Sequence, residues 1–491
     1  MASTDPPYSP KVQKRTLKGH RQPVLCVSHP GDHAKYDADL QHHPSLLLSG
    51  SEDGTARLWD LRTRKTAYCM IVPKIDETND VTAVAFHPSV IGQSSAESGD
   101  TAIASSSRID CMVYASSGTN VYGYDLRTCT GPIIKTPHLD LSSSFQCQDE
   151  INQLSFSFPK RNKDGCRNYQ LAAVDDCGEV HIPSECISQD LASQQSPISS
   201  KHTVLHHAEP GSHTIASCAV FRPHVNGVYV ASGGTDCMVK LFDVTKPKRA
   251  TASIHIKPAE SENTTQICNP PFIHSLQWSP SGRLLAAGVG DGSCVILRGE
   301  GNRLIEIGRL GYDQGGHGSA VAAVCFLCFG ASALSTKQTR SVEAEDRLLI
   351  SAGNDGKILF WDLGGNMVDG DAMDPLLYLG GCSDAKEQVK KQGNELQNAT
   401  EAMNSASISS KKSKGKNKKK GKTNNQHKTS TDDGFFLDDL LPSPPKVLFQ
   451  IPHHHKPNWI TCSRASSDAL PSSVFVADTT NDISIYSLPT Q

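Results

Sequence analysis

The chain has 491 residues, enough for one large domain or two medium ones. Its formal net charge of −3 creates no overall field that would recruit nucleic acid or a membrane surface. It has no apolar run of about 18 residues, and its first residues lack the apolar segment of a secretion signal. Its sixteen cysteines are scattered through strand-like runs, so we interpret them as reduced, buried side chains.

The first clear element is a β-hairpin within residues 45–62, which read SLLLSGSEDGTARLWDLR. Leu46–Leu48 is apolar, and Thr55–Trp59 alternates polar and apolar side chains, as half-buried strands do. Between them lies a turn in which Asp53 can bond local backbone and Gly54 tolerates a positive φ. We therefore predict two paired strands that end in a Trp-Asp dipeptide.

The same pattern returns along the chain. An inner apolar strand is followed by a hairpin, at spacings of about 50–65 residues. Tyr124-Asp125 replaces Trp-Asp in the second repeat, and the third has a hairpin turn at Asp175–Gly178 without any Trp-Asp. The seven repeats begin near Leu17, Val81, Ile151, Ile215, Ile273, Gly316 and Trp459. They predict an all-β, seven-bladed propeller.

Two features concern the ends of this arrangement. The last repeat stops after its third strand, whereas Val12–Lys18 precedes the first repeat where an outer strand would belong. We therefore expect the N-terminal strand to complete the last blade, because closure removes exposed sheet edges.

The composition changes between residues 364 and 445, where the chain is polar and carries a lysine-rich run, Lys411–Lys422. Such composition predicts a long disordered insert before the last blade. The predicted organisation is a flexible N-terminus at 1–11, blades one to six with the closing strand at 12–363, the disordered Lys-rich insert at 364–445 and the last blade at 446–491.

The order Gly-His, strand, hairpin and Trp-Asp resembles the WD-repeat family. The resemblance implies a buried chain of hydrogen bonds in each complete blade, made by a His, a strand Ser, a turn Asp and the Trp. The residues that match these two structural tetrads are His20, Ser49, Asp53 and Trp59, and His317, Ser351, Asp355 and Trp361. A Ser/His/Asp catalytic triad is the alternative. The recurrence of the set favours a structural network, so we predict no catalytic residue and no enzyme.

The sharpest functional feature is an arginine placed two residues after the aspartate in both Trp59-Asp60-Leu61-Arg62 and Tyr124-Asp125-Leu126-Arg127. Equivalent positions in successive blades would set the two arginines side by side on one face. The resemblance implies a box that docks onto the damaged-DNA-binding adaptor of cullin-RING ubiquitin ligases. The predicted adaptor-binding residues are Trp59, Asp60, Arg62, Asp125 and Arg127. The alternative is that each arginine only pairs locally with its aspartate.

Several local strings are similar to one small branch of that family, at 23–26, 80–84, 353–358 and 476–478. This resemblance implies a protein-interaction platform that acts as a substrate receptor, with the ligase adaptor, a cullin scaffold and an unknown client protein as partners. A non-ligase scaffold that binds a peptide or chromatin tail at the propeller mouth is the alternative. We expect no cofactor, no membrane association, a monomer within a larger complex, and a nuclear or cytoplasmic location.

The remaining motifs leave alternatives open. Lys411–Lys422 has almost no aromatic neighbours, so nucleic acid is not an expected partner, and the run is either a nuclear import signal or a solvating tether. Phe435–Leu441 can dock on a partner or on the propeller itself. Neither the Cys325/Cys328 pair nor His453–His455 has enough ligands nearby, so we predict no metal site.

Overall fold

The computed structural model describes thirteen stretches of the chain: residues 12–30, 45–74, 79–88, 112–145, 147–158, 169–183, 202–209, 211–224, 228–258, 269–327, 346–364, 445–463 and 472–488. The predicted flexible N-terminus at 1–11, Lys411–Lys422 and Phe435–Leu441 lie outside these residues.

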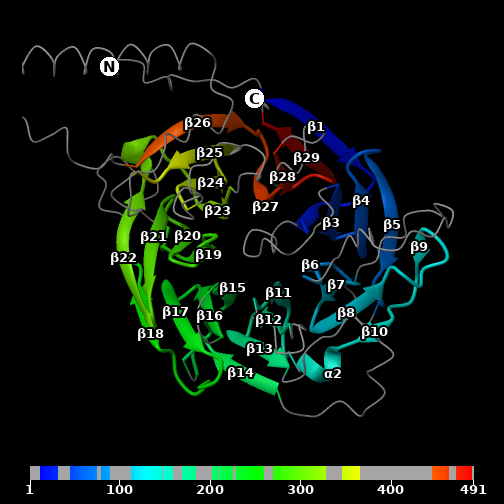
Figure 1. Cartoon of the computed structure of the whole chain (residues 1–491), viewed down its shortest axis with the longest axis horizontal. Helices are drawn as coiled ribbons and strands as arrows, with labels where there is room; N and C mark the ends of the chain where they lie inside the picture. The colour runs from blue at the N-terminus through cyan, green and yellow to red at the C-terminus, as the bar shows by residue number, and fades with distance from the viewer. Residues whose placement is uncertain are drawn as a thin grey trace, which may run out of the picture.

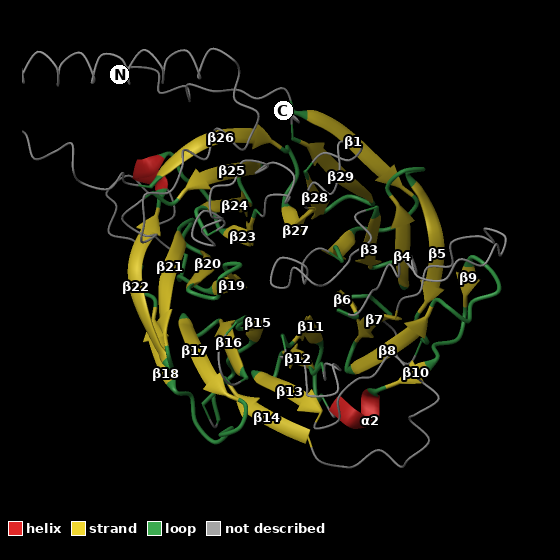
Figure 2. Ribbon diagram, in the orientation of Figure 1, coloured by secondary structure: helices red, strands yellow, loops and turns green. Residues whose placement is uncertain are grey.

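Seven antiparallel sheets are arranged as blades around a central axis (Figure 1). In each blade, four antiparallel strands are ordered from the centre to the rim, and blade one has a fifth strand. Figure 2 shows the short helix α2 (Ser142–Phe145) at the outer rim, beside blades two and three. The structure is the all-β, seven-bladed propeller that the repeats predict.

The first three blades are built from strands whose order in the sheet follows their order in the chain. Blade one contains β2 (Val24–Ser28), β3 (Leu46–Ser51), β4 (Thr55–Asp60) and β5 (Lys65–Ile71). Blade two contains β6 (Ala83–Phe86), β7 (Met112–Ser117), β8 (Asn120–Asp125) and β10 (Leu139–Asp140). Blade three contains β11 (Ile151–Phe156), β12 (Leu171–Asp175), β13 (Glu179–Pro183) and β14 (His202–His206).

The next three blades follow the same plan. Blade four contains β15 (Ala216–Phe221), β16 (Tyr229–Gly234), β17 (Met238–Asp243) and β18 (Ala252–His255). Blade five contains β19 (Ile273–Trp278), β20 (Leu284–Val289), β21 (Cys294–Glu300) and β22 (Arg303–Leu310). Blade six contains β23 (Val321–Phe326), β24 (Leu348–Gly353), β25 (Lys357–Asp362) and β26 (Lys446–Pro452).

The ring is closed by both ends of the chain, as predicted. Blade seven contains β27 (Pro457–Ser463), β28 (Ser473–Asp478) and β29 (Asp482–Ser487), and its outer strand is β1 (Gln13–Lys18). Strand β1 pairs antiparallel with β29, with Leu17 opposite Ile483. Both of these side chains are buried in one apolar cluster with residues of blade one.

One predicted boundary is wrong by a strand. The sequence division began the last blade at residue 446, but β26 pairs along its whole length with β25 and is the outer strand of blade six. The reason is that β25 would otherwise be an unpaired edge, and a chain that returns after a long excursion can still supply the missing strand. The insert at 364–445, of which the structure describes only Gly364 and Pro445, therefore interrupts blade six.

The core lies between neighbouring blades rather than inside any one of them. A typical apolar cluster combines Ile350 and Phe360 of blade six with Ile460 and Val476 of blade seven. Each blade packs against a neighbour on both faces in this arrangement, so its strands are apolar on both sides near the centre.

Polar side chains also join the blades. The Arg222 guanidinium of blade four donates to the carbonyl oxygens of Gly282 (2.8 Å), Gly299 (2.6 Å) and Gly301 (2.6 Å), all in blade five. It also lies over the ring of Trp278, 4.8 Å from the ring centroid. A single buried cation thus fixes the angle between two blades.

Blade one has a feature that the repeat pattern did not predict. The chain that leaves β8 of blade two forms β9 (Ile133–Ile134), which pairs in parallel with β5 of blade one before it returns to blade two as β10. Figure 1 shows β9 outside β5 at the rim. Blades one and two are therefore joined by a shared sheet edge as well as by their cores.

Candidate functional site

The predicted tetrad of blade one forms. His20 Nδ1 donates to Asp53 Oδ2 over 3.0 Å, because an ionised carboxylate can only accept. His20 Nε2 then accepts from the Ser49 hydroxyl (2.8 Å), which in turn accepts from Trp59 Nε1 (2.8 Å). The histidine and the tryptophan are buried, so the chain holds the loop before β2 onto the hairpin.

Blade six repeats this arrangement with almost the same distances. His317 Nδ1 lies 2.9 Å from Asp355, while its Nε2 lies 2.8 Å from Ser351 Oγ. The Trp361 indole donates to the same hydroxyl over 2.8 Å. Two blades far apart in the sequence thus have the same hydrogen-bond network, which supports a structural role for these residues.

Two related networks escaped the sequence search. In blade four, His207 bonds Ser232 (2.6 Å) and Asp236 (3.0 Å), but no glycine precedes this histidine and Phe242 replaces the tryptophan. A search for any histidine upstream of a Ser-x-x-x-Asp hairpin would have found it.

In blade seven, His453 Nδ1 bonds the Tyr486 hydroxyl over 2.8 Å, and its Nε2 lies 3.0 Å from Asp478. The first histidine of His453–His455 is therefore part of the fold, whereas His454 and His455 are exposed. Only the side-chain contact with Tyr486, which lies on a distant strand, shows this role.

The tetrads shift the pKa values of their members. Burial lowers the pKa of His20 below its ordinary 6.5, although the Asp53 carboxylate opposes this shift. Burial alone would raise the pKa of Asp53, but hydrogen bonds from His20, Thr55 and the Arg21 amide outweigh it and hold that pKa well below its usual range. The network is therefore built for a neutral imidazole beside an ionised carboxylate.

The two predicted Asp-Arg boxes adopt one geometry. Arg62 Nε and Nη2 donate to the two oxygens of Asp60, each over 3.1 Å, and the Arg62 amide donates to the same carboxylate over 2.9 Å. Arg127 makes the same fork with Asp125, over 2.9 Å for both bonds, with the amide at 3.0 Å. The local pairing that the sequence left as an alternative is therefore present in both boxes.

The five predicted adaptor-binding residues differ in exposure. The Arg62 side chain is 66% exposed and that of Arg127 is 30% exposed. Trp59 and Asp125 are buried, so they position the boxes from inside and cannot touch a partner. The Asp60 carboxylate is partly exposed, and although burial would raise its pKa, the hydrogen bonds and charge of Arg62 lower it.

Both boxes lie on the same face of the propeller. Strands β4 and β8 are the third strands of adjacent blades and run in the same direction, so the turns after Asp60 and Asp125 leave the same side of the disc. The Tyr124 hydroxyl, which stands where blade one has Trp59, donates across the blade boundary to the carbonyl of Ile71 (3.2 Å). This bond and β9 join the two blades that carry the boxes.

The other third strands end differently. Asp243 of blade four accepts hydrogen bonds from Thr245, and Asp362 of blade six pairs with Arg347 from the start of its neighbouring strand. Among the blades whose described third strand ends in aspartate, an arginine two residues later occurs in blades one and two. Their shared geometry is thus a property of this sector of the ring.

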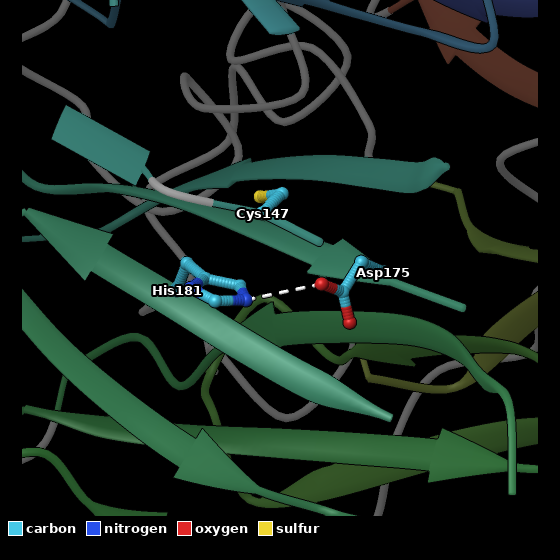
Figure 3. A group of neighbouring side chains, drawn as sticks. All are labelled: Cys147, Asp175 and His181. Atoms are coloured by element: carbon cyan, nitrogen blue, oxygen red, sulfur yellow. Dashed lines mark hydrogen bonds and ion pairs between the residues drawn. The ribbon is translucent and has the colours of Figure 1, made fainter. Parts of the chain in front are cut away.

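Other sites are few in the described part of the chain. One group of metal-ligating side chains comes together, Cys147, Asp175 and His181 in blade three (Figure 3). Cys325 Sγ lies 3.3 Å from Cys462 Sγ across the boundary of blades six and seven, while Cys328 lies outside the described residues. None of the described helices has the length and apolar character needed to span a bilayer.

The fold is a seven-bladed β-propeller whose tetrads resemble those of WD repeats, and a family comparison agrees. The model of the family described as "WD domain, G-beta repeat" matches residues 11–60, 199–243 and 263–296. The chain therefore carries WD repeats, and protein-interaction scaffold is the class of function that this architecture indicates.

Particular relatives sharpen the comparison. The chain is 26% identical over 366 residues to the "WD repeat-containing protein 53 homolog" of Dictyostelium discoideum, which covers 72% of this chain and 78% of that protein. The branch of the family indicated by the local strings at 23–26 and 353–358 is that of WD repeat-containing protein 53. A shorter match, 34% identical over 64 residues, joins 13% of the chain to 16% of the "THO complex subunit 6 homolog" of Danio rerio.

Proposed function

We propose that this propeller is a substrate receptor that docks onto the damaged-DNA-binding adaptor of a cullin-RING ubiquitin ligase through Arg62 and Arg127. The observation that supports it is the paired fork: two arginines at equivalent positions of adjacent blades, oriented by identical bonds to Asp60 and Asp125. The client protein binds a different surface, and the complex works in the nucleus or the cytoplasm.

The fork explains how local pairing and docking are compatible. Each carboxylate uses two of the five guanidinium N–H groups, and the remaining donors of Arg62 point away from Asp60. Because the aspartate and the amide hold the side chain in one orientation, less side-chain entropy is lost on binding. Local pairing thus pre-organises an arginine for a partner's carboxylate or carbonyl groups.

The test is affinity purification of the full chain from cells, with wild type beside the Arg62→Ala/Arg127→Ala variant, read by mass spectrometry. We expect adaptor and cullin with wild type and their loss from the variant, because arginines are frequent interface hot spots. Lys246→Ala/Arg249→Ala is the matched control, since it also removes two exposed cations, from the connection after the third strand of blade four. Purified adaptor and chain should repeat the result by direct binding.

Three results would oppose the proposal. Retained adaptor binding by the double arginine variant would show that the face carrying Arg62 and Arg127 does not dock onto the adaptor. Absence of adaptor and cullin from the wild-type sample, with other proteins enriched, would favour a non-ligase scaffold that binds a peptide or chromatin partner at the propeller mouth. An equal loss with the control variant would assign the effect to general charge.

A further inference from the structure

Blade three holds a histidine in an unusual setting. His181 of β13 is buried, and its Nε2 lies 3.1 Å from Asp175 Oδ2 and 3.4 Å from Glu179 Oε2. The Cys147 sulfur lies within 4.8 Å of the ligand atoms of His181 and Asp175. Figure 3 shows His181 and Asp175 directed toward one another, with the Cys147 sulfur beside them. A thiol and two carboxylates thus surround one ring nitrogen.

A single imidazole cannot satisfy this set. One N–H can serve only one carboxylate at a time, and Nδ1 of His181 is buried without a hydrogen-bond partner among the described residues. The histidines of blades one, four and six, in contrast, have both ring nitrogens bonded. Nε2 of His181 therefore lies between two carboxylates and can donate to only one of them.

The carboxylates also lack a fixed cation. In the part of the chain that the structure describes, Asp175 and Glu179 form ion pairs only with histidines, His181 and His206. Asp53 and Asp236 have a lysine or arginine partner, Arg57 and Lys240, whereas Asp478 of blade seven, like Asp175, pairs with a histidine. Blade three differs from these blades by adding a second carboxylate and a thiol beside its histidine.

We propose that Cys147, Asp175 and His181 bind a Zn²⁺ ion, with Glu179 beside the histidine as a further oxygen donor. Sulfur, imidazole nitrogen and carboxylate oxygen are the ligands that zinc uses in proteins. In tetrahedral coordination, ligand nitrogen and oxygen atoms lie roughly 3.3 Å apart, close to the observed separation of His181 Nε2 and Asp175 Oδ2.

The surroundings hold these ligands in place. Asp175 Oδ1 accepts from the Glu179 amide over 3.0 Å, and its Oδ2 lies 3.4 Å from the amide of Gln148, next to the cysteine. Burial, together with the charges of Asp175 and Glu179, raises the pKa of the Cys147 thiol. Metal binding therefore replaces the thiol proton, which passes to solvent as the Zn–S bond forms.

A nucleophilic Cys-His-Asp triad does not fit the same residues. No hydrogen bond joins the Cys147 thiol to His181, whose Nε2 is paired with Asp175 and whose Nδ1 has no partner among the described residues. An activated cysteine needs a lowered pKa and a base in contact. The site lies at the start of β13, on the face opposite Arg62 and Arg127, so metal binding and adaptor docking are independent.

The experiment uses the purified full chain, stripped with a chelator and titrated with Zn²⁺ alone and with Co²⁺ as a spectroscopic substitute. We expect one tightly bound zinc per chain, a thiolate-to-cobalt charge-transfer band and a rise in Tm with zinc. Cys147→Ser should abolish the cobalt band and lower zinc affinity by about tenfold or more, since even loss of an outer-shell partner costs 10–100-fold. Asp175→Asn should lower the affinity as well.

Cys177→Ser is the matched control, because this exposed cysteine lies in the turn between β12 and β13 and is not part of the ligand group. A His454→Ala/His455→Ala background removes an exposed histidine pair that could bind zinc by itself. Circular dichroism of Cys147→Ser checks that this variant folds. Absence of the cobalt band in wild type, equal zinc affinity of Cys147→Ser and wild type, or loss of the band with Cys177→Ser would each overturn the site.

Discussion

Blade one and blade three both bury a histidine beside an aspartate, but the histidine arrives by different routes. In blade one, His20 comes from the loop that precedes the blade, and both of its ring nitrogens are bonded, to Asp53 and Ser49. In blade three, His181 belongs to the third strand, and one of its ring nitrogens has no partner among the described residues.

The comparison shows how one pair of residue types serves two purposes. A histidine from outside the sheet joins a loop to a hairpin and completes a closed network, so its bonding capacity is used up by the fold. A histidine from within the sheet connects no additional segment of the chain, so the side chains around it remain available to a ligand. Mutations in the closed networks should therefore lower the free energy of unfolding, whereas mutations in the open cluster should lower the affinity for metal.

The largest expected effect breaks the closed network at its centre. Ser49→Ala leaves the Trp59 indole and His20 Nε2 without their shared partner, and each buried polar atom left unpaired costs about 1–3 kcal/mol. Ser351→Ala should cost a similar amount, because its distances to Trp361 and His317 are the same. Urea unfolding of both variants measures the free energy of unfolding.

Ser212→Ala is the control, since this serine is exposed and should change stability by less than about 0.5 kcal/mol. If Ser49→Ala changed the free energy of unfolding as little as this control, the tetrad of blade one would not contribute to stability. A large loss for one serine but not the other would show that the two tetrads differ despite their common geometry.

A smaller effect is expected where blade two replaces the tryptophan by tyrosine. Tyr124→Phe removes the bond from the Tyr124 hydroxyl to the Ile71 carbonyl and leaves the ring in place, so we expect a loss of about 0.5–1.5 kcal/mol. Thermal and urea unfolding measure it. Because this bond crosses a blade boundary, weaker adaptor binding by Tyr124→Phe would further indicate that the two boxes act together.

The smallest expected effect is a change in the slope of stability against pH. The folded-state pKa of His20 is below 6.5, so the unfolded chain binds more protons as the pH falls below that value. The stability contributed by neutral His20 is complete above pH 6.5 and is lost as the pH falls toward the folded-state pKa. Urea midpoints of wild type and His20→Asn, measured from pH 7 downward, should therefore approach each other; parallel profiles would contradict the assignment.

The sequence predicted most of the ring because its signals are local. Strand alternation in Thr55–Trp59 and the turn residues before it need only their neighbours to form a hairpin, and the Gly-His and Trp-Asp ends mark the complete blades. The two complete tetrads and the closure by β1 follow from that repeat. The Asp-Arg forks also follow, since both partners lie two residues apart.

What depended on long-range pairing was missed or misplaced. The assignment of β26 to blade six, the network of His453 with Tyr486 and the parallel strand β9 are not encoded in any short pattern. The different exposures of Arg62 and Arg127 also became known only from the packed blades. In each case the deciding partner lies on another strand or another blade.

By itself, then, the amino-acid sequence determined the class of fold, the number of blades, the closing strand and the residues of two tetrads, because period-two alternation and turn chemistry act over a few residues. Only the tertiary structure decided which strands share a sheet after a long insert and which side chains meet across blades. The cluster of Cys147, Asp175 and His181 is the clearest case: three unremarkable positions of a degenerate repeat become a ligand set because folding removes them from water and brings them together.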